Sequence, residues 1–388
     1  GNARPRCVGH PGENLDRKSS RKPEGCQGKS VVYTAVAWAR PWNSYWKRIR
    51  MRRIGAAARK GVKMRDKYGR NIDYVRISVT DRCNMRCTYC MPEEGVAAIP
   101  HSEILTYDEI KRLAGIFASL GITKVKLTGG EPLVRKGIPE LIAMLKSIPD
   151  IEQVTLTTNG TLLKEHMPAL ADAGLDAVNI SIDALDERLY EQITRRNGLR
   201  AALGGLDAAL SCPQLKVKVN CVPLAGVNDR EWVTLAGIAR DKEADVRFIE
   251  MMPIGLGRKH AGRTQDEIME ALRKAYGEEK TVQGYHGNGP GVYVRFEGFK
   301  GRIGFISALS HKFCGGCNRV RLTSAGYLKP CLQYAGGMDV KALLRGQFPD
   351  SVLREQVRRA VYGKPAGHCF DSPVTDGMEE MEMSRIGG

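Results

Sequence analysis

Three cysteines in the stretch Asp81–Pro92 have the spacing of an iron–sulfur site. Cys83, Cys87 and Cys90 follow the pattern C-x3-C-x2-C. Three thiolates ligate three irons of a [4Fe–4S] cluster and leave the fourth iron open for another ligand. A redox CxxC pair or a zinc knuckle is the alternative, but zinc normally takes four ligands, and the next histidine or cysteine after Cys90 is His101. The spacing therefore favours an open-site cluster.

A second set of three cysteines lies nearer the C-terminal end. Cys314 and Cys317 form C-x2-C, and Cys331 follows. A structural zinc site remains open here, because C-x2-C is half of a zinc ribbon and His311 would supply a fourth ligand. A second [4Fe–4S] cluster with a free iron that binds substrate explains the count of three better.

Two arginines directly follow the C-x2-C motif, in the sequence CGGCNRVR. Alternate residues of a strand face the same side, so the guanidinium groups of Arg319 and Arg321 would point into one cavity. Paired arginines suit bidentate binding of phosphate, and two exposed surface arginines are the alternative reading. We therefore expect an anion site beside the second set of cysteines.

The basic charge of the chain is concentrated in its N-terminal segment. The 388 residues carry a net charge of +17, and residues 1–63, with 16 Lys/Arg and three acids, contribute +13 of it. Residues 1–63 are predicted to be a basic extension that is disordered or not native, with an amphipathic or transit-like helix at Trp38, Trp42 and Trp46 as the alternative. The charge therefore gives no specific support for nucleic acid as a partner.

Cysteine grouping and hydropathy limit the class of protein further. Six of the eleven cysteines fall in the two tight sets, and no apolar run approaches the roughly 18 residues that span a bilayer. Clustered cysteines without secretory features indicate metal sites in a reducing compartment. We therefore expect a cytoplasmic protein with no membrane segment.

Residues 64–253 alternate between apolar, β-branched runs and helical patterns. Strands are predicted at 74–80, 122–127, 154–158, 177–182, 216–222 and 246–251, and helices between them. This order predicts an α/β fold with a parallel sheet covered by helices. Six units are fewer than the eight of a full TIM-type barrel. We therefore predict an incomplete (βα)6 barrel, closed on its side by a smaller C-terminal region, 254–388, with a hairpin at 292–306 and a helix at 350–362.

Polar residues and glycines follow each predicted strand, where the site of a parallel barrel gathers. The second strand runs into Thr128-Gly129-Gly130-Glu131-Pro132. Two glycines let the backbone approach a ligand closely. We expect exposed amides and carbonyls there to bind the ammonium and carboxylate of a ligand, with Glu131 as a further acceptor.

The first cysteine motif, with the aromatic Tyr89 before its last cysteine and a Gly-Gly-Glu motif downstream, resembles the radical S-adenosylmethionine (SAM) superfamily. The resemblance implies that SAM binds the open iron and that the reduced cluster cleaves it to methionine and a 5′-deoxyadenosyl radical. The second cysteine set and its arginines are similar to the GTP 3′,8-cyclase family of molybdenum cofactor biosynthesis. This likeness runs from Met64 to Gly388, through TGGEP, TTNG, SID, KVN, RFIEMMP, CGGCNRVR and the terminal Gly387-Gly388.

The resemblance also implies roles for individual residues. The ligands of the first cluster would be Cys83, Cys87 and Cys90, and those of the second Cys314, Cys317 and Cys331. The SAM contacts would be Tyr89, Gly130, Ser181 and Met252. The GTP contacts would be Arg76, Lys126, Thr157, Lys218, Arg319, Val320 and Arg321. The first three cysteines with Arg319 and Arg321 would be catalytic, and the terminal Gly387-Gly388 would reach into the site.

The implied reaction is the conversion of GTP to (8S)-3′,8-cyclo-7,8-dihydroguanosine 5′-triphosphate by a lyase. In it the radical takes the ribose 3′-hydrogen and the carbon radical attacks guanine C8. The implied partners are an electron donor such as flavodoxin or ferredoxin, the downstream cyclic pyranopterin monophosphate synthase, and a second copy in a homodimer. Another radical SAM enzyme with an auxiliary cluster, a zinc-binding module and a two-cluster electron carrier are the alternatives.

Overall fold

One mixed β-sheet organises the residues that the computed structural model describes, which are 63–283, 287–370 and 377–387. Its strands are β1 (Tyr74–Ser78), β2 (Lys124–Thr128), β3 (Gln153–Thr158), β4 (Ala177–Ser181), β5 (Lys216–Cys221), β6 (Ala244–Ile249), β7 (Glu279–Thr281), β8 (Val292–Phe296), β9 (Ile303–Ile306), β10 (Arg319–Leu322), β11 (Tyr327–Lys329) and β12 (Met338–Asp339). The α-helices are α1 (Tyr107–Ser119), α2 (Ile138–Lys146), α3 (Leu163–Asp172), α4 (Glu187–Thr194), α5 (Leu199–Leu210), α6 (Trp232–Asp241), α7 (Gln265–Tyr276), α8 (Val340–Arg345), α9 (Asp350–Tyr362) and α10 (Met383–Ile386).

The strand order is β12-β11-β10-β1-β2-β3-β4-β5-β6-β9-β8-β7. The neighbours from β10 through β1–β6 to β9 are all parallel, and the outer strands at both ends are antiparallel. The predicted incomplete barrel of six strand–helix units is confirmed by β1–β6. The C-terminal strands extend this same sheet at both of its edges, with β10 beside β1 and β9 beside β6.

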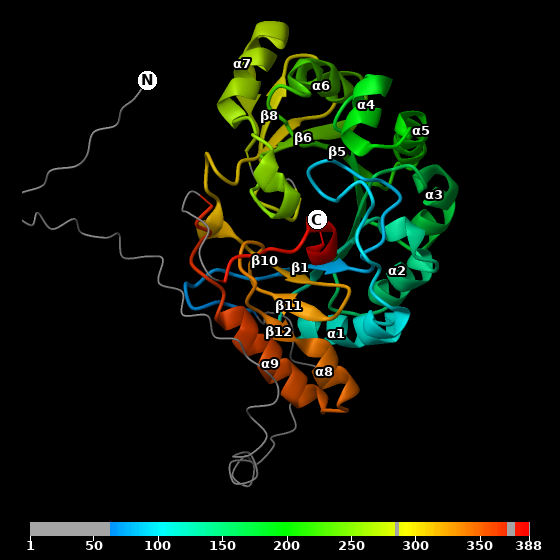
Figure 1. The fold of residues 1–388 in the computed structure, drawn as a ribbon, viewed down its shortest axis with the longest axis vertical. Coiled ribbons are helices and arrows are strands. Elements are labelled where there is room, and N and C mark those ends of the chain that lie inside the picture. The colour runs from blue at the N-terminus through cyan, green and yellow to red at the C-terminus, as the bar shows by residue number, and fades with distance from the viewer. Residues whose placement is uncertain (1–62, 284–286, 371–376, 388) are drawn as a thin grey trace, which may run out of the picture. The chain divides into compact units, whose positions relative to one another are not determined.

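Side-chain alternation explains why the strands face two different surroundings. In β1, Val75 and Ile77 are fully buried in the hydrophobic core, whereas Arg76 lies between them and lines a cavity. Such alternation places every second side chain on the inner face of the sheet. Figure 1 shows α1–α6 along the outer side of the strands and α10, with the C-terminal end, on the inner side.

Helix caps follow the sequence closely. Thr106 Oγ1 accepts a hydrogen bond from the amide of Glu109, and Glu109 Oε2 accepts one from the amide of Thr106. The T-x-x-E sequence of Thr106–Glu109 predicts such a reciprocal pair, a capping box, which satisfies two amides that the helix itself leaves without partners. The structure confirms this start of α1.

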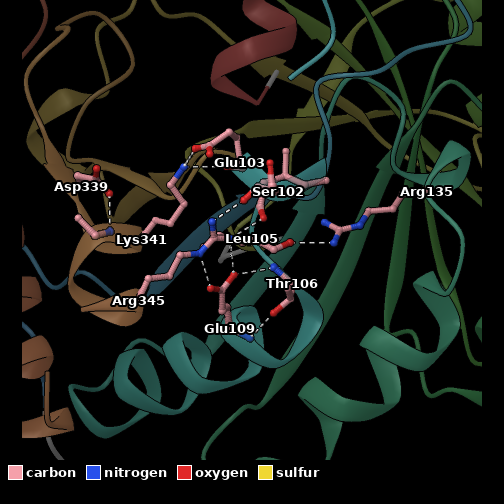
Figure 2. A network of polar contacts seen from close by, with 11 residues as sticks. Ser102, Glu103, Leu105, Thr106, Glu109, Arg135, Asp339, Lys341 and Arg345 are labelled. Atoms are coloured by element: carbon pink, nitrogen blue, oxygen red, sulfur yellow. Dashed lines mark hydrogen bonds and ion pairs between the residues drawn. The ribbon is translucent and has the colours of Figure 1, made fainter. Parts of the chain in front are cut away.

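Ion pairs attach helix α8 of the C-terminal region to the first turn of α1 and to the segment that precedes it (Figure 2). Lys341 Nζ lies 2.5 Å from a carboxylate oxygen of Glu103, and Arg345 Nε lies 2.8 Å from one of Glu109. Arg345 also donates to the carbonyl of Ser102 at 2.5 Å. These contacts join two regions that are far apart in the chain.

Several predictions concern residues outside the described ranges. The extension 1–62, with Trp38, Trp42 and Trp46, and the terminal Gly388 are among them. The domain limits at 63/64 and 253/254 stay predictions. Within the described ranges, none of the helices combines the length and the apolar composition that crossing a membrane requires.

Candidate active site

A cavity of about 1030 Å³ lies on the inner side of the sheet. Its volume is at the upper end of the range that ligand sites usually occupy. Nearly all of the side chains predicted to bind SAM or GTP line it, together with the first cysteine set: Arg76, Cys83, Cys87, Tyr89, Cys90, Lys126, Gly130, Thr157, Ser181, Lys218, Met252, Arg319 and Arg321. Residues from seven strands or strand ends are therefore brought into one space.

The cysteine loop, Asp81–Pro92, is held by backbone contacts with helix α4. The amides of Arg86 and Thr88 each donate at 2.9 Å, to the carbonyls of Thr194 and Ile193 respectively. These bonds fix the loop on either side of Cys87. The backbone of the loop is thus attached directly to the barrel.

The two glycines of the Gly-Gly-Glu motif let this loop pack against the end of β2. A Cβ atom on Gly130 would lie 2.3 Å from the carbonyl oxygen of Arg82, and one on Gly129 would lie 2.7 Å from that of Thr80. The Gly130 amide donates to the Thr80 carbonyl at 2.7 Å, and the Glu131 amide to the Arg82 carbonyl at 2.8 Å. The amides of Gly130 and Glu131 therefore have partners within the protein, and ligand binding by the other backbone groups of this motif stays a prediction.

Glu131 is also used inside the protein. It is 1% exposed, and its carboxylate accepts from the amide of Leu133, the hydroxyl of Thr158 and the amide of Asn159. Burial raises the pKa of Glu131 to about 7, against these hydrogen bonds, which lower it. The Glu131 carboxylate therefore links the end of β3 to the Gly-Gly-Glu turn.

The donor set of the first cysteine loop fits an iron–sulfur cluster. Burial raises the pKa of the Cys83 thiol to about 11 and that of Cys90 to about 12, and burial, followed by the charges of Cys90, Asp183 and Cys83, raises the pKa of Cys87 well above its usual value. Thiols that influence one another in this way lie close together, and a bound metal offsets the cost of ionising them. No three His, Cys, Asp or Glu side chains of the described residues converge on a single ion, but in a cluster each thiolate binds its own iron.

Tyr89 is oriented by a carboxylate from the Ser-Ile-Asp motif after β4. Its hydroxyl donates to Asp183 Oδ2 at 2.7 Å, and Asp183 Oδ1 accepts from the amide of Val222 at 2.8 Å. Burial raises the pKa of Asp183 to about 6, and burial followed by the Asp183 charge raises the pKa of Tyr89. The aromatic ring is therefore fixed against the cavity wall beside the cysteines.

Positive side chains from several strands line the same cavity. Arg76 of β1 is paired in register with Lys126 of β2 and with Arg321 of β10. Lys218 and Arg319 complete the predicted set, and all five line the cavity. The sheet register thus brings together cations that are spread over nearly 250 residues of sequence.

These cations repel one another in the absence of an anion. Burial, followed by the charges of Arg247, Arg76, Lys218 and Arg319, lowers the pKa of Lys126 well below its usual value. Burial, followed by Arg76 and Arg319, lowers the pKa of Arg321 as well. Among the described residues, Lys126 has no ion-pair partner. A polyphosphate would relieve this repulsion, because its negative charges would be shared by the whole cluster.

Arg247 also belongs to this cluster, although it is not among the residues predicted from the sequence. It lies on β6, lines the cavity and donates two hydrogen bonds to Asn220 Oδ1, at 3.0 and 2.6 Å. The signal was available in RFIEMMP, because alternation along β6 puts Arg247 on the inner face. We therefore add Arg247 to the candidate anion-binding residues.

Lys218 has a carboxylate partner that the sequence analysis also missed. Its Nζ donates to Asp245 Oδ2 at 2.8 Å and to the Tyr293 hydroxyl at 2.9 Å. Arg302 pairs with the same carboxylate at 2.8 Å. Asp245 therefore holds two cations at the edge of the cavity where β6 meets β9.

Thr157 and Val320 differ in how the structure places them. Thr157 lines the cavity, and its hydroxyl accepts from Asn179 Nδ2 at 3.3 Å. Val320 is 1% exposed and its side chain packs in the hydrophobic core, away from the neighbouring Arg319 and Arg321. Val320 is therefore outside the cavity lining.

The three cysteines of the second set, Cys314, Cys317 and Cys331, are not among the residues that line this cavity. Lys364, which is 3% exposed, donates to the carbonyls of Arg319 and Pro330, at 2.9 and 2.5 Å, and so links the segments that carry Cys317 and Cys331. Burial raises the pKa of Cys317, but the charges of Lys364 and Arg319 outweigh it and the net pKa is lowered to about 7. A thiol that ionises readily suits a metal ligand.

A buried arginine holds the loop of Cys314. Arg70 donates to the carbonyls of Cys314 and Ala366 at 2.8 Å and to that of Pro365 at 2.5 Å. Its Nε lies 2.5 Å from Asp66, whose side chain is fully buried. Both second-site segments are therefore fastened by buried cations, which is consistent with a donor set that has to be held ready for a metal group.

The chain resembles known proteins over most of its length. Residues 77–238 match the model of the Radical SAM superfamily, and residues 244–370 match that of Molybdenum Cofactor Synthesis C. A GTP 3′,8-cyclase of Clostridium perfringens is 44% identical over 328 residues, which are 84% of this chain and 100% of that protein. A GTP 3′,8-cyclase of Petrotoga mobilis is 43% identical over 331 residues, again 84% of this chain and 100% of that protein.

A solved structure supports the fold independently of close sequence similarity. SuiB of Streptococcus suis, in a crystal structure bound to S-adenosylmethionine, aligns with a TM-score of 0.51 at 15% sequence identity. The alignment covers 75% of this chain and 69% of that one. At this identity the likeness concerns the arrangement of the elements alone.

Proposed function

The chain belongs to the GTP 3′,8-cyclase family of the radical SAM superfamily, and we propose that it converts GTP to (8S)-3′,8-cyclo-7,8-dihydroguanosine 5′-triphosphate, the first step of molybdenum cofactor biosynthesis. Such an enzyme is a lyase, and its family uses a [4Fe–4S] cluster and SAM. The observation that carries the proposal is one cavity with a three-cysteine loop on one wall and a cluster of buried cations on another.

The first cysteine loop would hold the SAM cluster through Cys83, Cys87 and Cys90. When bound and reduced, this cluster would supply the electron that cleaves SAM to methionine and a 5′-deoxyadenosyl radical. Tyr89, Gly130, Ser181 and Met252 line the same part of the cavity and would hold SAM in place. Asp183 would keep the Tyr89 ring in the orientation that its hydrogen bond defines.

The cation cluster would bind the triphosphate of GTP. Arg76, Lys126, Arg319 and Arg321 surround one region of the cavity, and Lys218 and Arg247 extend it along the sheet. Asp245 already offsets the charge of Lys218, and a bound triphosphate would offset the repulsion among the other cations. The cluster would thereby fix the ribose relative to the source of the radical, which is a positioning effect.

The second cysteine set would hold a second [4Fe–4S] cluster through Cys314, Cys317 and Cys331. The lowered pKa of Cys317 and the buried contacts of Arg70 and Lys364 support a metal group there. Three protein ligands would leave one iron for the substrate. A structural zinc ion is the alternative that metal analysis separates from it.

The C-terminal residues would complete the site. Arg321 donates a hydrogen bond to the carbonyl of Gly387, and Met383 and Ser384 line the cavity. A radical reaction requires the exclusion of water, and a buried tail would supply that.

The partners and location that we propose follow from the same chemistry. An electron donor such as flavodoxin or ferredoxin would reduce the first cluster, and a cyclic pyranopterin monophosphate synthase would consume the product. Every cysteine of the described residues is a free thiol, which supports a reducing, cytoplasmic compartment. We further propose a homodimer, which a sedimentation measurement would test.

The experiment that tests the function is anaerobic incubation of the iron-loaded protein with reductant, SAM and GTP. We expect 5′-deoxyadenosine and the cyclic nucleotide to form together and to depend on GTP. Recovery of unchanged GTP alongside 5′-deoxyadenosine would show that the chain is a different radical SAM enzyme. A content of about one zinc and no iron in the anaerobic protein would contradict radical chemistry altogether.

A further inference from the structure

We propose that Lys329 and Glu379 are positioning residues for the C-terminal tail, residues 377–387, and that their buried ion pair determines where Gly387 meets the active site. Lys329 ends β11, and Glu379 lies eight residues before Gly387. The consequence for turnover rests on the proposed GTP cyclase function. The structural part, which is the anchoring of the tail, stands on the contacts alone.

The ion pair is the most completely buried one among the described residues. The Lys329 side chain is 0% exposed and that of Glu379 is 2% exposed. Lys329 Nζ donates to Glu379 Oε2 and, at 2.6 Å, to the carbonyl of Tyr334. Because a charge is costly to bury without a partner, each side chain strongly favours the arrangement in which it meets the other.

Glu379 also shapes the chain that follows it. Its second carboxylate oxygen, Oε1, accepts hydrogen bonds from the amides of Glu380 at 3.1 Å and Met381 at 2.9 Å. One oxygen therefore holds the tail to β11, and the other turns the backbone towards α10. A single side chain thus sets both the position and the direction of the tail.

The backbone of Glu379 is fixed from two further elements. Its amide donates to the carbonyl of Gln333 at 2.6 Å. Its carbonyl accepts from Arg258 of the 3-10 helix η6 (Gly255–Lys259) at 2.7 Å. Glu379 is therefore the point at which the tail is attached to both sides of the barrel opening.

The rest of the tail runs from this point to the reacting region. Ser384 and Ile386 are buried, and Ser384 lines the same cavity as Cys90. Gly387 then accepts the hydrogen bond from Arg321. The tail thus shares the cavity with the first cysteine loop and contacts the cation cluster, and an error in its anchoring would reach both.

A buried ion pair is by itself weak evidence for stability. Another role of such a pair is to select one arrangement of the chain over its alternatives. Here the two charges come from parts of the chain 50 residues apart. The tail has few other buried apolar groups before α10. The pair therefore fits a role in selecting the position of the tail.

The test compares Lys329→Met and Glu379→Gln with the matched control Lys341→Met. Glutamine keeps an oxygen that accepts from the Glu380 and Met381 amides, so this variant removes the charge and leaves the turn. Lys341 also belongs to the C-terminal region, but its partner is the exposed Glu103 of the segment before α1 and not a residue of the tail (Figure 2). All three proteins are measured in the iron-loaded, full-length form.

Three quantities are measured on each protein: iron content, hydrogen exchange of the amides of residues 380–387, and the ratio of 5′-deoxyadenosine to cyclic nucleotide. We expect both tail variants to keep their iron, to lose exchange protection in 380–387 and to form cyclic product roughly 10- to 100-fold more slowly, since a displacement of about 1 Å costs that much in an aligned reaction. The ratio of 5′-deoxyadenosine to product should rise. Lys341→Met should match the wild type in all three.

Two results would overturn the proposal. One is unchanged protection and unchanged product ratio in both tail variants. The other is loss of iron or of protection throughout the chain in both, which would make the pair a general structural element. If the wild type forms no cyclic nucleotide, the proposed function fails, but the exchange of residues 380–387 still decides whether the pair anchors the tail.

Discussion

Replacing Arg70 by methionine should empty the second cysteine site and leave the first one loaded. Methionine keeps much of the side-chain volume but none of the donors that hold the carbonyls of Cys314, Pro365 and Ala366. The Cys314 loop then loses its hydrogen bond to Arg70, and with it the connection through Arg70 to Pro365 and Ala366. If each site holds one [4Fe–4S] cluster, iron should fall from about eight to about four atoms per chain.

The same change should also destabilise the protein, because it leaves a buried charge. The Asp66 side chain is fully buried, and Arg70 is its ion-pair partner. Removing one member of a buried pair typically costs about 3–5 kcal/mol, whereas an exposed pair is worth roughly 0–1 kcal/mol. Arg112→Met, which breaks an exposed pair with Asp350, is therefore the matched control and should change stability by less than about 1 kcal/mol.

The assay combines iron and sulfide analysis with denaturant unfolding of the iron-free protein. To assign the iron to a site, Arg70→Met is repeated in a chain whose Cys83, Cys87 and Cys90 are alanines, so that all remaining iron reports on the second site. The double variant Asp66→Asn with Arg70→Met should be more stable than Arg70→Met alone, because it removes both charges. The reasoning would be refuted if Arg70→Met kept the full iron content and lost under about 1 kcal/mol.

Three further changes separate binding from structure. Lys126→Met should raise the KM for GTP by about 10- to 100-fold, which is the value of a charged hydrogen bond. It should not lower the thermal midpoint of the free protein, because it removes a cation that its neighbours repel. A lowered midpoint would argue against the charge cluster. Gly130→Ala should lower the iron content of the first site, because the added Cβ would meet the backbone of Arg82. The control Gly115→Ala should keep its iron, because a Cβ there meets no atom within 4 Å. Equal iron contents in the two variants would contradict this prediction. Asp183→Asn should remove on the order of 3 kcal/mol from the pH dependence of the free energy of unfolding. In the wild type the pKa of Asp183 is raised to about 6, so stability is lost as pH rises from about 4 through 6. The prediction fails if the stabilities of the two proteins change in parallel over this pH range.

The fold was predictable wherever the sequence alternates over whole strands. The strands β1–β6 and the capping box of Thr106 and Glu109 depend on local patterns, and the structure confirms them. Short elements such as β12 and α10 carry too few residues for a pattern, and their positions depend on distant partners. The attachment of β9 and β10 to opposite edges of the barrel sheet is equally a matter of tertiary pairing.

The site was predictable in its members but not in its contacts. Motifs selected nearly all of the residues that line the cavity, but they did not reveal that Asp245 pairs with Lys218 or that Arg70 binds the Cys314 loop. Arg70 and Cys314 are separated by 244 positions, and nothing in the sequence relates them. The glycines of the Gly-Gly-Glu motif show the same limit, because their close contact proved to be with the cysteine loop.

The register between β10 and β1 connects the second cysteine motif to the cavity. Arg321 lies opposite Arg76, and Val320 and Leu322 are buried in the core on the other face. If β10 slipped by one residue relative to β1, Val320 and Leu322 would point into the cavity, and Arg319 and Arg321 would point into the core. The cost of burying two unpaired guanidinium groups excludes that alternative far more strongly than the strand hydrogen bonds do. The residues that would bind phosphate therefore depend on the apolar residues between them, and Val320, which does not line the cavity, matters to the site because it fixes which way Arg319 and Arg321 point.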